Sequence, residues 1–270
     1  MTGGGLTSEQ RREVEALIDG WVTDNEIPSA AVAIVDSSEL VYSEGFGTDG
    51  ESADPDTMFQ FGSCSKTITA LAVTHLAEQG EMALDDPVDD YVPYLKDAPG
   101  EPITIAELLG HTSGLVEDGT AVSEISDMIG VGESTPSLET AEDFHDHMSG
   151  AAEGRVTNSD DHRYSNTGYV VLGQIIEEVT GRQFSEYVSE NVFDALGMAR
   201  STLDYDEFEG AENTATPSIM RDGKIQEVTL DWHDFSKPTG GLATSPRDAV
   251  QILRLLAGDG EALRDPDFGF

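Results

Sequence analysis

The chain has 270 residues, with 53 acidic and 14 basic side chains and a formal net charge of −39 at pH 7. The acidic residues are spread along the whole length, so the surface repels itself unless dense counterions screen it, and at molar salt the Debye length falls to roughly 3 Å. This composition indicates a halophilic protein, and it disfavours nucleic acid and anionic membranes as partners because both bind clustered lysine and arginine.

Three further features of the sequence predict a cytoplasmic protein. The single cysteine, Cys64, cannot form an internal disulfide, which is typical of a reducing compartment. The N-terminal stretch lacks the charged segment and the following apolar segment of a secretory signal. No run approaches the ~18 apolar residues of a transmembrane helix. We therefore expect no membrane partner.

The N-terminal region predicts one helix followed by a β-hairpin. Thr7 and Gln10 have the spacing of a capping box. Segments 30–36 and 40–47 have the composition of two strands joined by a short polar turn, and the first of them is apolar enough to be buried on both faces. The apolar stripe of the preceding helix predicts a packed face made of five residues: Val14, Leu17, Ile18, Trp21 and Val22.

From Ser63 onward the pattern is mainly helical. One predicted helix ends at Gly80, and another begins with the capping box of Thr104 and Glu107. Between about 116 and 160 the chain is acidic and rich in glycine, serine and threonine, which indicates an insertion solvated by salt. Further helices are predicted by the segments 165–181, 184–197 and 245–258.

A serine and a lysine stand at the start of the first of these helices, in the pattern S-x-x-K. The i,i+3 spacing of Ser63 and Lys66 puts the lysine one turn along the same face, so its amine can reach the serine hydroxyl. The positive end of the helix dipole favours a negative charge at the serine oxygen. Taken alone, the pattern allows two interpretations: Ser63 is a helix cap, or it is a nucleophile activated by a neighbouring base.

A second tripeptide, Tyr164-Ser165-Asn166, directly precedes another long predicted helix. It supplies a phenol, which can relay protons, and a carboxamide, which can hold a substrate amide. By itself the tripeptide is an ordinary surface sequence. Together with S-x-x-K at an equivalent helix start, it favours the nucleophile interpretation of Ser63.

At these residues the chain resembles a known family, the serine β-lactamases and penicillin-binding-protein-like hydrolases, and within it the branch of class C β-lactamases, D-aminopeptidases and carboxylesterases. The resemblance covers roughly residues 10 to 257. It rests on five segments in the family's order: FQFGSCSKTITALAVTHLAEQGEMALDDPVDDYVP, ITIAELLGHTSGL, YSNTGYVVLGQIIEEVTGRQFSEYV, VFDALGMARST and GGLATSPRDAVQIL.

The resemblance implies an α/β (α+β) fold of the β-lactamase/transpeptidase type, in which helices flank an antiparallel sheet and a mostly helical lobe adjoins it. We expect a single catalytic domain over residues 1–270. Within it, residues 1–62 form the N-terminal helix and hairpin, residues 63–257 form the mainly helical lobe, and residues 258–270 form a truncated end.

The resemblance also implies a serine hydrolase that works through an acyl-enzyme. Ser63 is then the acylated nucleophile, Lys66 its activating partner, Tyr164 the general base and acid, and Asn166 a group that orients the substrate. The expected substrate is a small ester, amide or peptide, including β-lactam-like compounds and D-peptides. No metal and no cofactor are expected, and the oligomeric state is left open.

One family element, a K-T-G or H-x-G triplet on a strand near the C-terminus, is missing. Its only lookalike is Lys237-Pro238-Thr239-Gly240. It is rejected because its segment, KPTGGLATSPRD, resembles the family's loop before a helix, and because proline would remove an N–H from a central strand. We therefore expect missing C-terminal sheet strands and a chain that is a fragment of a longer hydrolase. A non-catalytic or weakly active ligand-binding protein with this fold remains the alternative.

Other candidate residues are interpreted as structural. A histidine such as His111 can act in catalysis, but the resemblance implies that its segment, HTSGL, is a structural turn. Cys64 is interpreted as a small buried helix residue, and the alternative is a reactive thiol. Trp232 is interpreted as a packing residue, and the alternative is that it lines the mouth of the cleft. His145 and His147 are two positions apart, so on a helix they point in different directions and make a poor metal pair.

Overall fold

The computed structural model describes residues 5–36, 39–48, 53–116, 126, 128–130, 148–150, 152–157 and 161–257. These residues form two compact units. The first consists of the described residues within 1–60, 190–217 and 243–270, and the second of those within 61–189 and 218–242. Most of the predicted acidic insertion at about 116–160, and all of the predicted truncated end at 258–270, lie outside the described residues.

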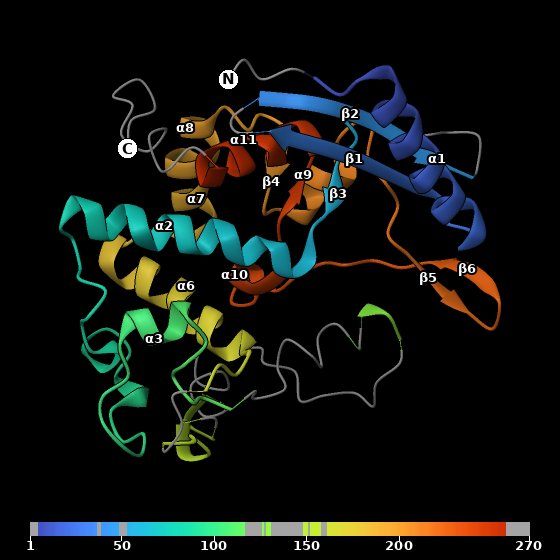
Figure 1. The fold of residues 1–270 in the computed structure, drawn as a ribbon. Coiled ribbons are helices and arrows are strands. Elements are labelled where there is room, and N and C mark those ends of the chain that lie inside the picture. Colours follow the sequence, from blue (N-terminus) through green and yellow to red (C-terminus); the bar gives the residue numbers. More distant parts are fainter. Residues whose placement is uncertain are drawn as a thin grey trace. The chain divides into compact units, whose positions relative to one another are not determined.

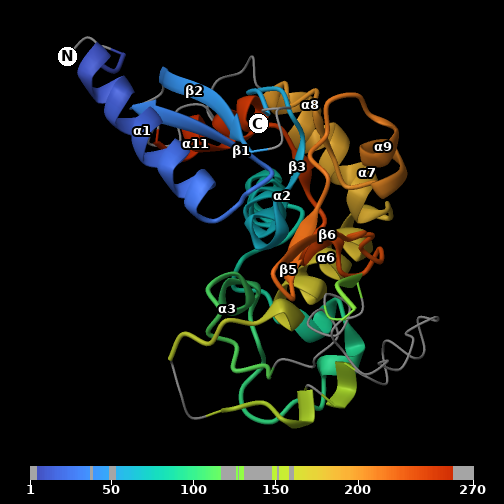
Figure 2. The ribbon, with the colours of Figure 1, turned by 90° about the vertical axis from the view of Figure 1, so that its right-hand side faces the viewer.

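The first unit contains the predicted helix and hairpin (Figures 1 and 2). Thr7 caps the helix, and both hydrogen bonds of the predicted capping box with Gln10 are present. One face of the antiparallel strand pair carries Tyr42 and Phe46, which form a buried core with Val22 of the helix. These elements are α1 (Ser8–Asp24), β1 (Ser29–Asp36) and β2 (Glu39–Gly47).

Two details of this prediction are wrong. β1 is not buried on both faces: its residues are only half-buried, and the last, Asp36, is exposed. Leu17 and Trp21 of α1 are 70% and 57% exposed. A hairpin of two strands offers α1 a narrow surface, so only the line Val14, Ile18 and Val22, at i,i+4 spacing, packs against it.

A second, smaller sheet and the predicted last helix complete the first unit. The guanidinium of Arg200 donates to the carbonyls of Asp56 and Glu212, each at 2.6 Å, which ties the segments around this sheet together. The sheet has the order β3-β7-β4, with β3 (Phe59–Gln60), β4 (Ser201–Thr202) and β7 (Ala243–Thr244) all antiparallel. The helices are α8 (Asp194–Leu196), α9 (Tyr205–Gly210) and α11 (Pro246–Ala257), of which α11 packs against β1.

The second unit is mainly helical, as predicted (Figure 1). Its two long helices, α2 (Lys66–Gln79) and α6 (Asn166–Thr180), pack side by side, and each ends at a left-handed glycine, Gly80 or Gly181. The capping box predicted for Thr104 is present at α3. The remaining elements are α3 (Ile105–Leu109), α7 (Phe184–Val188), α10 (Lys237–Gly240), the hairpin β5 (Ser218–Arg221) and β6 (Lys224–Glu227), the 3-10 turns Gly62–Ser65, Val88–Asp90 and Pro93–Leu95, and a π-helical turn at Ser189–Phe193 where the two units adjoin in sequence.

The combination of helices with antiparallel strand pairs confirms the predicted α/β (α+β) class. In the parts of the chain that the structure describes, no helix is both long enough and apolar enough to cross a membrane.

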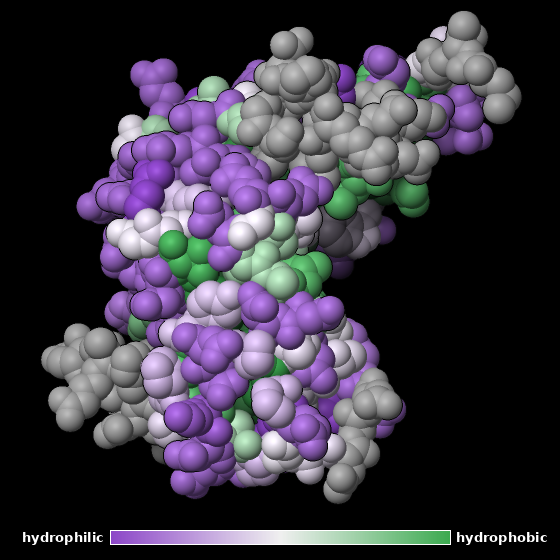
Figure 3. Space-filling model, turned by 90° about the vertical axis from the view of Figure 1, so that its left-hand side faces the viewer, coloured by the Kyte–Doolittle hydropathy of each residue, from purple (hydrophilic) through white to green (hydrophobic). Residues whose placement is uncertain are grey.

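We expect the melting temperature to rise strongly between low salt and molar KCl. Hydrophilic residues dominate the face drawn in Figure 3, in keeping with the net charge of −39, and self-repulsion among carboxylates falls as the Debye length shortens. Thermal unfolding followed by circular dichroism checks this. Near pH 4, where about half of the carboxylates are protonated, the dependence on salt should weaken; a melting temperature independent of KCl at pH 7 would contradict the prediction.

Candidate active site

Ser63 lies in the 3-10 turn Gly62–Ser65, directly before the first residue of α2. Gly62 adopts φ +52, a left-handed conformation that favours glycine. The hydroxyl of Ser65 donates to the carbonyl of Gly62 at 2.6 Å and accepts from the N–H of Leu242 at 2.9 Å. These contacts fix the turn, and they leave the Ser63 side chain exposed at its surface.

Lys66 reaches Ser63 as the spacing predicts, and its ammonium is almost completely buried, with the residue 6% exposed. Its Nζ donates to Ser63 Oγ at 3.3 Å, to Asn166 Oδ1 at 2.8 Å and to the carbonyl of Thr239 at 2.8 Å. The two shorter bonds come from α6 and α10. They hold the amine in a fixed position beside the serine hydroxyl.

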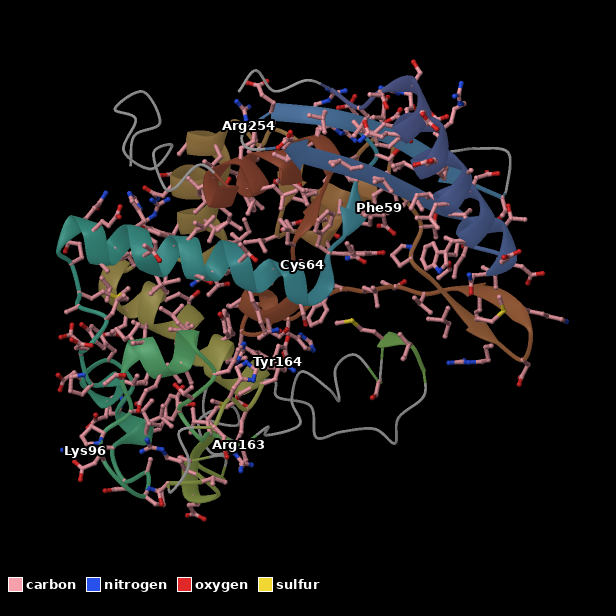
Figure 4. All side chains as sticks on the ribbon, in the orientation of Figure 1. Phe59, Cys64, Lys96, Arg163, Tyr164 and Arg254 are labelled. Carbon is pink, nitrogen blue, oxygen red and sulfur yellow. The ribbon has the colours of Figure 1, made fainter. Side chains whose placement is uncertain are left out.

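Tyr164 contacts the same serine from the opposite motif. Its hydroxyl donates to Ser63 Oγ at 2.8 Å, and its ring centroid lies 5.0 Å from Lys66 Nζ. The residue is 50% exposed, so its phenol can exchange protons with water. The structure therefore brings the four predicted site residues together, each within hydrogen-bond distance of at least one other. In Figure 4, Tyr164 and Cys64, the neighbour of Ser63, lie near the beginning of α2.

The start of α6 sets the position of Tyr164. Ser165 is the N-cap, and its hydroxyl accepts from the N–H of Gly168 at 3.1 Å. The backbone N–H of Ser165 donates to Nδ1 of His111 at 3.2 Å, and the N–H of Arg163 donates to the carbonyl of His111 at 2.8 Å. The segment that carries Tyr164 is thus bonded on both sides to the HTSGL turn.

A carbonyl of α10 belongs to the site, although sequence reasoning did not find it. Lys237–Gly240 form a helical turn, which confirms that this segment is not the strand of a third motif. Its carbonyls nevertheless accept from Lys66, at Thr239, and from Thr69 Oγ1, at Pro238, both at 2.8 Å. Every residue has a backbone carbonyl, so the sequence contains no signal for this contact. The only unusual feature of the segment is its proline and glycines.

Two close contacts hold α10 in place. A Cβ added to Gly173 of α6 would lie 2.3 Å from Cγ of Pro238, and one added to Gly240 would lie 2.4 Å from the ring of Trp232. Trp232 is 9% exposed, which confirms that it is a packing residue. Both positions therefore require glycine because there is no space for a Cβ, and not because of the backbone conformation.

We expect Gly173→Ala to lower both stability and activity. Alanine normally stabilises an exposed helix interior by about 0.5–1 kcal/mol relative to glycine, but here the methyl group would overlap Pro238 and displace the Thr239 carbonyl; overpacking costs about 1–3 kcal/mol. The matched control is Gly20→Ala in α1, whose added Cβ would meet nothing within 4 Å. Chemical denaturation should show opposite signs for the two variants. A stabilised Gly173→Ala protein with unchanged kcat would contradict the role given to this contact.

The other candidates are resolved as follows. Cys64 is exposed and not buried as expected, because the 3-10 turn directs it outward before α2 begins. His145 and His147 lie outside the described residues. Among the residues whose placement is described, no three histidine, cysteine, aspartate or glutamate side chains gather as a metal site requires.

A family model described as Beta-lactamase matches residues 14–267, and the chain belongs to this family. The predicted resemblance and the predicted β-lactamase/transpeptidase-like fold are thereby confirmed.

Curated relatives include Protein flp of Staphylococcus aureus (strain MW2) and penicillin-binding protein 4 of Amycolatopsis lactamdurans. The first is 27% identical over 205 residues, which are 73% of this chain and 39% of the relative. The second is 28% identical over 253 residues, 90% of this chain and 63% of the relative. The chain therefore spans less than two thirds of the length of either protein.

Among solved structures, the octameric penicillin-binding protein homologue from Pyrococcus abyssi matches with a TM-score of 0.84 and 30% identity, over 93% of this chain and 57% of that one. The D-amino acid amidase from Ochrobactrum anthropi SV3 matches with a TM-score of 0.73 and 24% identity, over 97% and 73%. The class C β-lactamase from Rhodobacter sphaeroides matches with a TM-score of 0.72 and 22% identity, over 94% and 67%. The last two show the fold alone.

Proposed function

We propose that this protein is a serine hydrolase that forms an acyl-enzyme on Ser63. The observation that carries the proposal is the position of Ser63 Oγ, 2.8 Å from the hydroxyl of Tyr164 and 3.3 Å from Nζ of Lys66. A serine hydroxyl is a weak nucleophile unless a neighbouring group takes its proton. Here two groups that can exchange protons contact it directly, on an exposed turn that a substrate can reach.

In the proposed reaction, Ser63 Oγ attacks the carbonyl carbon of an ester or amide. The serine proton passes to the hydroxyl oxygen of Tyr164, which passes its own proton to the leaving group as the bond to the acyl carbon breaks. The ammonium of Lys66, held by Asn166 and Thr239, stabilises the negative charge that develops on Ser63 Oγ. Water, losing a proton to Tyr164, then attacks the acyl-enzyme, and Ser63 recovers its proton.

Asn166 has two tasks in this proposal. Its Oδ1 accepts from Lys66, which fixes the orientation of the side-chain amide. The Nδ2 group of Asn166 is then directed to the opposite side of the side chain. There it can donate a hydrogen bond to the carbonyl of a bound amide or peptide substrate.

The proposed substrates are small esters, amides or peptides, including β-lactam-like compounds and D-peptides. The fold is shared with a class C β-lactamase and a D-amino acid amidase, which supports this class without selecting one member. We also propose that both units belong to a single catalytic domain, since the family model runs through residues 14–267, and that the protein works in a salt-rich cytoplasm.

A second candidate function is ligand binding without turnover. It is favoured by the sequence, in which no K-T-G or H-x-G triplet supplies the usual third motif. Loss of one oxyanion donor costs other acyl-transfer enzymes roughly 10²–10³ in kcat. Under this alternative, Ser63 binds or is acylated but is not regenerated.

The test compares the wild type with Ser63→Ala in molar KCl, using p-nitrophenyl esters and nitrocefin as substrates and intact-protein mass spectrometry to detect acylation. Ser189→Ala, at an exposed serine of the same unit, is the matched control. Because Cys64 is exposed beside Ser63 and thiols also react with esters, Cys64→Ala must keep its acylation. Equal labelling of wild type and Ser63→Ala contradicts the proposal, whereas stable acylation without turnover favours the binding protein.

A further inference from the structure

His111 lies at the centre of a cluster of four rings next to the proposed nucleophile. Its ring centroid is 4.7 Å from that of Tyr164, 5.1 Å from that of Tyr169 and 5.4 Å from that of His162. The planes of His111 and Tyr164 are inclined by 31°, so the imidazole lies against the face of the phenol ring. This ring contact is a direct constraint on the side chain that touches Ser63.

The backbone on both sides of Tyr164 is also bonded to His111. The carbonyl of His111 accepts from the N–H of Arg163 at 2.8 Å, and its Nδ1 accepts from the N–H of Ser165 at 3.2 Å. His111 thus contacts the two neighbours of Tyr164, Arg163 and Ser165, and the ring of Tyr164 itself. The backbone of His111 has φ +56, a left-handed conformation that is uncommon for residues other than glycine and that asparagine, aspartate and histidine adopt more often than the rest.

The hydrogen bond to Ser165 determines the protonation state of the imidazole. A backbone N–H can only donate, so Nδ1 of His111 must carry a lone pair. The neutral ring therefore has its proton on Nε2. A proton added at Nδ1 would replace the acceptor with a second donor that faces the Ser165 N–H, and this hydrogen bond would be lost.

We propose that His111 is a positioning residue for Tyr164, and that its neutral imidazole is required to aim the phenol at Ser63 Oγ. This inference rests on the proposed function, since it gives His111 a task in the same acyl transfer. Protonation of His111 releases the Ser165 backbone, and the Tyr164 hydroxyl leaves hydrogen-bond distance of Ser63. Turnover is lost in acid for this reason.

Among the residues that the structure describes, four titratable groups face His111: His162 and Tyr164 from the segment before α6, Tyr169 from α6, and Lys66 from α2. Burial lowers the pKa of His111, and the positive charges of His162 and Lys66 lower it further. The neutral form therefore persists below the ordinary histidine value of about 6.5. Removing the charge at position 162 must therefore raise the pKa of His111. The acid limb of the pH profile, which is the fall of activity as the pH is lowered, must then move to higher pH.

The experiment measures kcat and KM for a chromogenic ester from pH 4.5 to 8 in molar KCl, for the wild type, His111→Asn and His162→Gln. Asparagine tolerates a positive φ and keeps an acceptor, but it neither stacks as a ring nor titrates in this range. We expect His111→Asn to lower kcat about 10- to 100-fold with KM nearly unchanged, and to lose the acid limb that His111 causes. We expect His162→Gln to shift that limb to higher pH.

A nitrogen-15 NMR titration of the histidines in the wild type gives a readout that does not depend on activity. Nδ1 of His111 should be unprotonated at pH 7, and its pKa should match the acid limb in both the wild type and His162→Gln. A protonated Nδ1 at pH 7, or an acid limb that neither substitution changes, overturns the inference. If His111→Asn does not fold, His162→Gln and the titration decide. Failure of the proposed function is seen separately, as a wild type that is not acylated at Ser63. In that case the protonation state of Nδ1, measured by NMR, still tests the contact between His111 and the backbone beside Tyr164.

Discussion

Replacing Lys66 with methionine is expected to lower kcat/KM for a chromogenic ester by at least about 10³-fold while the protein remains folded. The Nζ of Lys66 contacts Ser63 Oγ, Asn166 Oδ1 and the Thr239 carbonyl at the same time. Without it, Ser63 loses the charge that stabilises its oxyanion form, and Asn166 loses the bond that orients it. The effect should therefore fall on acylation, measured as the rate of the first turnover.

The stability of this variant separates catalysis from folding. Methionine fills nearly the same volume, but three acceptors lose a donor, and an unsatisfied buried acceptor costs about 1–3 kcal/mol. The cost of burying the charge disappears at the same time, so the melting temperature should fall only moderately. Lys96→Met is the matched control, since Lys96 is exposed in the same unit and lies far from Tyr164 in Figure 4. A Lys66→Met protein that acylates at the wild-type rate would remove Lys66 from the mechanism.

The sequence predicted those parts of the fold that depend on neighbouring residues. The capping boxes at Thr7 and Thr104, the hairpin and the ends of α2 and α6 at glycines are all local features, and each is confirmed. The exposure of Leu17 was not predictable in this way. It depends on the width of the surface that the hairpin offers to α1, and the periodicity of a helix does not encode that width.

The same distinction applies to the site. Ser63 and Tyr164 could be found because each lies in a short motif at a helix start. The carbonyl of Thr239 could not, since any residue supplies the same atom there. The role proposed for His111 could not be predicted either, because its contact with Ser165, 54 positions along the chain, exists only in the folded protein. Motifs therefore identified the groups proposed to react, while the groups that position them required the structure.

Replacing Tyr164 with phenylalanine is expected to lower kcat by about 10²–10⁴-fold with a small effect on substrate binding. The change removes one oxygen, the one that lies 2.8 Å from Ser63 Oγ. Phenylalanine keeps the ring that lies against His111 and the ring face near Lys66. Since the residue is 50% exposed, stability should change little.

The matched control removes the same atom from another tyrosine of the same unit. Tyr91 donates to Asp86 Oδ2 at 2.7 Å, and burial, followed by this partner, raises the pKa of Tyr91 to about 12. Tyr91→Phe should therefore lower the melting temperature and leave kcat unchanged. The reverse pattern is expected for Tyr164→Phe.

The choice of leaving group makes the test of Tyr164 specific. A p-nitrophenolate departs without a proton, whereas an alkoxide or an amine requires one from a general acid. If Tyr164 returns the serine proton to the leaving group, Tyr164→Phe must slow an alkyl ester or an amide more than a p-nitrophenyl ester. Equal losses would mean that Tyr164 acts only as a base towards Ser63 and water. Wild-type turnover of both substrates would show that the 2.8 Å contact with Ser63 has no part in proton transfer.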